Sequence, residues 1–160
     1  MASWKEVEVE APELAALARG LLEAHKHKTI ATLRRDGSPR ISGTEADIVD
    51  GELLWGGMWR SVKALDLRRD PRFALHSGSD DPPGWSGDAK VGGVAEEIED
   101  EERKRALVAA QGNADAESLG QFHLFRADIS ELIVTHLNEA RDKLVIEFWR
   151  AGEGVRRIER

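Results

Sequence analysis

Two Asp-Gly pairs most constrain what this chain can fold into. Asp36-Gly37 and Asp50-Gly51 each lie between short runs rich in apolar and β-branched residues. Asp-Gly is a pair that tight turns between antiparallel strands prefer. The sequence therefore predicts three strands, at residues 28–34, 39–45 and 52–57, joined in an antiparallel meander.

Further strands and helices are expected after and before this meander. Strands are predicted at residues 72–77, 89–98, 122–137 and 144–150, and helices at 12–22, 61–69 and 100–111. Ser61 and Asp100 stand where helix-capping residues are expected, and Gly92-Gly93 predicts a bulge in its strand. Residues 112–120 are expected to be irregular. Six or more short strands with a few helices predict a mainly β (α+β) fold, a β-barrel with peripheral helices, in a single domain spanning residues 1–160.

Composition excludes several classes of function. The chain has 160 residues and no cysteine, so disulfides, thiolate nucleophiles and Cys-ligated metals are absent. No apolar run is long enough to cross a bilayer, and residues 1–10 lack the basic start and apolar stretch of a signal peptide. We therefore expect a cytoplasmic protein. The net charge of −7 disfavours nucleic acid as a partner.

Basic residues are nevertheless concentrated in two parts of this acidic chain. They are Arg34, Arg35, Arg40, Arg60, Lys63, Arg68, Arg69 and Arg72 in the first half, and Arg150, Arg156, Arg157 and Arg160 near the end. This distribution is compatible with a local binding site for an anion. The alternative is that most of these side chains form a solvated face.

The stretch from Trp55 to Lys63 suggests where such an anion would bind. It runs from a strand through Gly56-Gly57 to a helix start at Ser61. Backbone N–H groups at a helix N-terminus lack intrahelical partners, and the helix dipole favours an anion there. Arg60 and Lys63 add positive charge. The sequence predicts a phosphate site, with a Ser-capped surface helix as the alternative.

Three stretches follow one another in the chain: DGSPR at residues 36–40, SVKALDLRRDPR at 61–72 and DAKVGGVA at 88–95. In this order they resemble the pyridoxamine 5′-phosphate oxidase-like, FMN-binding split-barrel superfamily. Residues 146–149 (IEFW) and 156–160 (RRIER) also look like the closing motif of the true oxidases. The resemblance implies a split β-barrel that forms a homodimer, with two flavins in clefts between the subunits. It further implies an oxidoreductase that passes electrons through FMN to or from a small-molecule substrate.

The resemblance also implies which residues bind the cofactor. Arg40, Ile41 and Ser42 would run along the isoalloxazine, and Gly56, Gly57 and Met58 would pass beneath the ring and ribityl chain. Ser61 and Lys63, with Arg60 beside them, would hold the phosphate. Asp88 would reach the cofactor from a neighbouring strand, and Trp149 and Arg160 would close the site from the partner chain. For Trp149 the alternative is a core aromatic at the end of a strand.

The chain departs from the family pattern at three positions. The usual Ser-Arg-Lys phosphate motif has Val62 in its middle position, and losing one charge-assisted bond costs on the order of 1.5–3 kcal/mol unless Arg60 replaces it. The lysine and histidine with which the true oxidases grip pyridoxamine phosphate correspond to Glu45, or its neighbour, and to Ile158. An acid there would repel a substrate phosphate, so vitamin B6 oxidation is not predicted.

Other functions remain open at this stage. A deazaflavin (coenzyme F420)-dependent reductase would need a basic groove, which Arg34, Arg35 and Arg40 could supply. A non-catalytic flavin, haem or tetrapyrrole carrier or sensor could use the same scaffold. No catalytic residue stands out. His76 and His123 are the best candidate proton donors, and the favoured alternative for each is a strand histidine with a structural partner. His25 and His27 would need further ligands to bind a metal, so no metal site is predicted.

Overall fold

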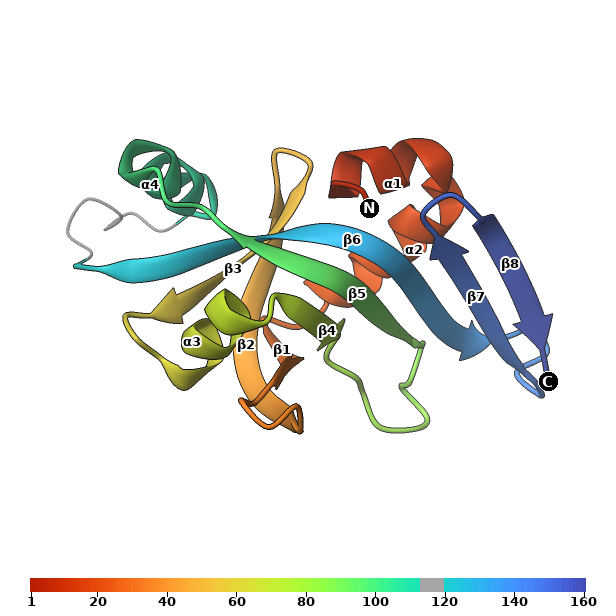
Figure 1. Cartoon of the computed structure of the whole chain (residues 1–160). Coiled ribbons are helices and arrows are strands. Elements are labelled where there is room, and N and C mark those ends of the chain that lie inside the picture. Colours follow the sequence, from red (N-terminus) through yellow and green to blue (C-terminus); the bar gives the residue numbers. More distant parts are fainter. Residues whose placement is uncertain (113–119) are drawn as a thin grey trace.

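The computed structural model describes residues 1–112 and 120–160, which form one antiparallel sheet of eight strands with four helices around it (Figure 1). The strands are β1 His27–Leu33, β2 Pro39–Val49, β3 Glu52–Met58, β4 Arg72–His76, β5 Asp88–Glu97, β6 Phe122–Leu137, β7 Leu144–Arg150 and β8 Gly154–Glu159. The helices are α1 Trp4–Glu10, α2 Pro12–Glu23, α3 Val62–Arg69 and α4 Glu101–Ala110. The predicted mainly β fold with peripheral helices is confirmed.

The strand order closes part of the sheet into a barrel. Neighbouring strands follow the order β3-β2-β1-β4-β5-β6-β7-β8, and β3 also pairs with β6. Strands β1 to β6 therefore form a closed barrel, and β7 and β8 extend the sheet beyond β6 as a hairpin at one side (Figure 1).

The barrel is split between β2 and β3. These strands pair only from Ala46–Val49 to Glu52–Trp55. The first half of β2 pairs with β1 on its other side, and the end of β3 pairs with β6. The facing edges of β2 and β3 thus separate towards α3, and the backbone groups on these separated edges do not hydrogen-bond to each other.

Large aromatic side chains fill the barrel and the space beneath the N-terminal helices. Trp4, Trp55, Phe125 and Trp149 are among the largest fully buried residues. Helix α1 packs on β3, and α2 packs mainly on β5 and β6. This core holds in place the strands between which the barrel is split.

Several local predictions can be compared with the structure. The bulge at Gly92/Gly93 is confirmed by a shift in the pairing of β5 with β6, and Asp100 caps α4 by accepting from Arg103 N–H at 2.6 Å. Ser61 occupies the N-cap of α3, but its side chain makes no capping bond. Residues 113–119 of the predicted irregular segment lie outside the described residues.

Two elements were not predicted. Helix α1 begins with a capping box between Ser3 and Glu6, and β8 is a fully exposed edge strand paired with β7. Within residues 1–112 and 120–160, no helix combines the length and apolar character needed to cross a membrane.

Candidate functional site

A cavity of about 760 Å³ lies where β2 and β3 separate. Its walls come from β2, β3, the start of α3, the end of α4 and the start of β6. Eight of the predicted cofactor-binding residues line it: Arg40, Ile41, Ser42, Gly56, Gly57, Met58, Ser61 and Lys63. Residues that are far apart along the chain are thus brought together around one space large enough for a cofactor.

Lys63 presents a positive charge to this cavity without a carboxylate partner. Its Nζ donates to Thr44 Oγ1 at 2.9 Å and to the Gly43 carbonyl at 3.4 Å. Among the described residues, no acidic side chain lies within ion-pair distance of it. Burial lowers the pKa of Lys63 from its ordinary value of 10.5. An anion in the cavity would offset this penalty on the charged form.

The hydroxyl of Ser61 also lacks a partner. Its Oγ is buried and makes no hydrogen bond to the described residues. A Cβ on Gly57 would lie 3.3 Å from this Oγ, so glycine leaves room around the hydroxyl. Because an unpaired buried hydroxyl costs free energy, an acceptor or donor on a ligand would stabilise it.

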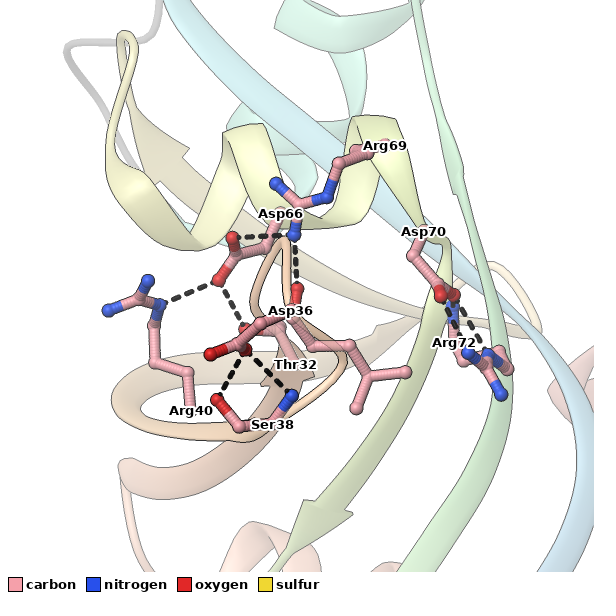
Figure 2. A network of polar contacts seen from close by, with 9 residues as sticks. Thr32, Asp36, Ser38, Arg40, Asp66, Arg69, Asp70 and Arg72 are labelled. Atoms are coloured by element: carbon pink, nitrogen blue, oxygen red, sulfur yellow. Dashed lines mark hydrogen bonds and ion pairs between the residues drawn. The ribbon is translucent and has the colours of Figure 1, made fainter.

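Arg40 is held by a buried carboxylate at the edge of the cavity (Figure 2). Asp66 of α3 accepts from Arg40 Nε at 2.6 Å, from Arg69 Nη2 at 3.0 Å and from Thr32 Oγ1 at 3.1 Å. Burial alone would raise the pKa of Asp66, but these hydrogen bonds outweigh it and lower the pKa. Figure 2 shows the terminal nitrogens of Arg40 pointing away from Asp66. They remain available to a ligand.

Successive side chains of β2 point to opposite faces of the strand, and this separates the cationic from the acidic side chains that line the cavity. Arg40, Ser42 and Thr44 share one face of the strand, whereas Glu45 and Asp47 lie on the opposite face with Ile41. Glu45 pairs with Lys26 at 3.4 Å, and Asp47 accepts from Gln111 at 3.3 Å. The cationic and hydroxyl-bearing side chains therefore face α3, where an anion would bind.

Arg60 lies beside the cavity but does not line it. Its side chain is exposed, its φ is 57°, and its backbone N–H donates to His123 Nε2 at 3.1 Å. The prediction that Arg60 contributes its charge to the phosphate site remains untested.

The remaining predicted residues lie elsewhere in the same chain. Asp88 is at the start of β5, in an ion pair with Lys90, and its Oδ1 lies 3.6 Å from His76 Nε2. Trp149 is fully buried on β7 and donates from Nε1 to Glu10 at 3.0 Å, a core position at the end of a strand. Arg160 pairs through its backbone with Leu144. Their roles at a cofactor site, the last two from a partner chain, stay predictions.

Comparison with protein families decides the relationship. The family model described as pyridoxamine 5′-phosphate oxidase matches residues 14–136, which include β1 to β5 and all but the last residue of β6. The chain belongs to the pyridoxamine 5′-phosphate oxidase family. Members of this family are typically dimeric. A search of curated proteins found no match.

Solved structures share the fold of this family member. PhzG from Burkholderia lata 383, solved with tetrahydrophenazine-1-carboxylic acid, is 13% identical, with 98% of this chain and 92% of that chain covered and a TM-score of 0.64. A putative pyridoxamine 5′-phosphate oxidase from Listeria innocua is 20% identical, and the match covers 79% of this chain and 98% of that chain with a TM-score of 0.59. A heme binding protein from Mycobacterium smegmatis is 16% identical, with 89% and 85% covered and a TM-score of 0.60.

Some cavity residues of this family member were missed by sequence reasoning. Thr44 follows Arg40 and Ser42 at a spacing of two, so strand alternation could have found it. Val108 and Gln111 of the α4 region, and Phe122 and Leu124 of β6, carry no local signal of this kind. Phe122 and Leu124 reach the cavity because β6 pairs with the end of β3, and Val108 belongs to a buried cluster with Leu124.

Metal binding has no support in the described part of the chain. No group of three or more His, Cys, Asp or Glu side chains there could hold an ion. His25 instead lies 3.5 Å from Asp80, and His27 lies 4.0 Å from Glu45.

Proposed function

We propose that this protein is an FMN-binding oxidoreductase that acts as a homodimer on a small molecule. The main support is the convergence of Arg40, Ser61 and Lys63 on one cavity of about 760 Å³. Each offers a donor that the described chain leaves wholly or partly unused. A phosphorylated, planar cofactor would satisfy these donors and cover the apolar residues beside them.

The phosphate end of FMN would bind at the start of α3. Ser61 would donate its hydroxyl and Lys63 its ammonium group, alongside the free N–H groups of the first helical turn. Val62 cannot supply the charge of the usual arginine. Since Arg60 lies outside the cavity lining, the second cation would be Arg40, held in place by Asp66.

The ring would lie between β2 and β3, against Ile41 and Met58. Backbone groups on the separated strand edges would hydrogen-bond its polar atoms. When bound, FMN would supply the electron transfer through its ring. The chain's own side chains would orient the cofactor, exclude water from one side and favour negative charge near Arg40 and Lys63.

Exposed apolar side chains near the cavity support a homodimer. They are Ile41, Met58, Trp59, Val62 and Leu65, and each is at least 42% exposed. Apolar groups clustered around a cavity mark an interaction surface on many proteins. A second copy placed there would bury these residues and enclose the cofactor.

The first test is to identify what co-purifies with the protein, by mass spectrometry and absorption spectroscopy. A flavin spectrum with FMN mass is expected. A Soret band would favour a haem carrier, which is supported by the fold shared with the heme binding protein from Mycobacterium smegmatis and with the heme storage protein HutZ from Vibrio cholerae. A colourless protein that binds the deazaflavin but not FMN would favour the F420 alternative.

The second test is an FMN titration of Lys63→Ala. Losing one charge-assisted contact at a half-exposed site should weaken binding about tenfold. Lys143→Ala is the matched control because Lys143 is exposed and remote from the cavity lining. Equal affinities of the two variants would refute the proposed phosphate site.

A further inference from the structure

The link between β3 and α3 decides where Ser61 and the start of α3 lie. It comprises residues 59–61, directly after Met58. Arg60 in this link has φ 57°, a left-handed conformation that costs a non-glycine residue about 1 kcal/mol. Ser61 N–H donates to the Met58 carbonyl at 3.0 Å. A strained link of this kind needs other contacts to keep its conformation.

His123 of β6 supplies such a contact. The residue is fully buried, and its Nε2 accepts from the Arg60 backbone N–H at 3.1 Å. The Trp59 ring stacks on the imidazole with centroids 4.8 Å apart and planes 11° apart. Two consecutive residues of the link are thereby fixed to one side chain of the barrel.

Glu97 at the end of β5 determines which nitrogen of His123 can accept. Its Oε1 lies 2.6 Å from His123 Nδ1, and its Oε2 forms an ion pair with Arg68 Nε of α3 at 3.0 Å. A carboxylate at Nδ1 requires a proton there, which leaves Nε2 with the lone pair that Arg60 N–H needs. Glu97, His123 and the link thus form one chain of hydrogen bonds.

We propose that His123 is a positioning residue for the anion-binding end of the cavity. Oriented by Glu97, it fixes Arg60 and so places the Ser61 hydroxyl and the first turn of α3 against the ligand. The inference rests on the proposed function only in taking a phosphorylated ligand at this end. His123 itself is not among the residues that line the cavity.

Two substitutions separate the bonds of His123. In His123→Gln the side-chain carbonyl reaches the Nε2 position and accepts from Arg60, without the bond to Glu97. In His123→Asn the amide reaches the Nδ1 position and bonds Glu97, with nothing for Arg60. Both remove the ring and its stacking, so any effect of lost packing is common to them. His123→Phe keeps a stacking ring and removes both bonds.

The first measurement is hydrogen exchange of the Arg60 amide in ligand-free protein. Protection is expected in the wild type and in His123→Gln, and its loss in His123→Asn and His123→Phe. The second is FMN affinity at neutral pH, which should fall roughly 3- to 10-fold in the Asn and Phe variants and stay near wild type in the Gln variant.

Equal exchange rates and equal FMN affinities in the Gln and Asn variants would overturn the inference. So would an unchanged affinity in the Asn variant despite a faster-exchanging Arg60 amide. If the wild type binds no FMN, the proposed function fails. The positioning of the link is then decided by the amide exchange together with binding of inorganic pyrophosphate, measured on the same variants.

Discussion

Replacing Asp66 by asparagine should both destabilise the protein and loosen Arg40. The side chain is 4% exposed and accepts from Arg40, Arg69 and Thr32 (Figure 2). Asparagine has nearly the same shape but only one acceptor oxygen and no charge. Its NH2 group would face a cation, and both arginines would lose a charge-assisted bond.

The size of the effect follows from these bonds. A hydrogen bond to a charged group contributes about 1.5–3 kcal/mol, and breaking a buried ion pair costs about 3–5 kcal/mol. Arg40 and Arg69 are 26% and 33% exposed, so water recovers part of their loss. We expect a loss of about 2–4 kcal/mol, which lowers Tm by about 5–15 °C in a domain of this size.

Thermal unfolding followed by circular dichroism measures this loss, with Asp36→Asn as the control. Asp36 is exposed and, among the residues that the structure describes, bonds only to Ser38 in the adjacent turn, so its variant should keep the wild-type Tm within error. A pH series adds a second signature. Because the pKa of Asp66 is lowered in the folded state, its stabilisation is complete above its ordinary pKa of 3.8 and is lost as pH falls through the lowered value. The wild type should lose this contribution in acid, and Asp66→Asn should not.

A Tm for Asp66→Asn equal to that of Asp36→Asn would refute the reasoning. It would mean that the two arginines are satisfied by water as well as by the carboxylate. A lower Tm with unchanged FMN affinity would keep the stability argument and remove the role of Asp66 in orienting Arg40.

Two further results are expected. Gly93→Ala should unfold at a clearly lower temperature than Gly43→Ala. A Cβ at Gly93 would lie 2.1 Å from the Asp128 carbonyl oxygen, whereas a Cβ at Gly43 meets nothing within 4 Å. Equal melting temperatures of the two variants would show that the bulge at Gly93 relaxes freely. FMN binding should weaken in alkali at a pH below the ordinary lysine pKa of 10.5, since burial lowers the pKa of Lys63 and the neutral amine attracts phosphate less. This loss of affinity should be absent in Lys63→Ala. If the loss persists in that variant, another group causes it.

Local signals predicted the elements of the barrel but not how the barrel closes. Both Asp-Gly pairs form turns, yet only Asp50-Gly51 has positive φ at both residues, whereas the turn at Gly37 spans residues 34–38. These signals depend on a few neighbouring residues, so the sequence displays them. The pairing of β3 with β6 joins segments about 70 residues apart, and nothing in either strand alone specifies it.

The same distinction applies to the candidate site. The glycines, serine and lysine after β3 could be recognised because they follow one another along the chain. The support behind them could not, because Arg60 and His123 are 63 residues apart and Arg40 and Asp66 are 26 apart. Ser61 was expected to cap α3, but its hydroxyl is left for the cavity, which only the three-dimensional position of Gly57 explains.

An acidic chain can hold an anion here because of how its charges are paired. The net charge is −7, yet one buried carboxylate, Asp66, is shared between Arg40 and Arg69, so this cluster keeps one positive charge at the cavity edge. Lys63 adds a second charge that no described carboxylate offsets. The acids of β2 lie on the opposite face of the strand, and Glu45 is paired there with Lys26. The local sign of the potential thus follows from strand alternation and from which pairs are buried, and neither can be obtained from composition.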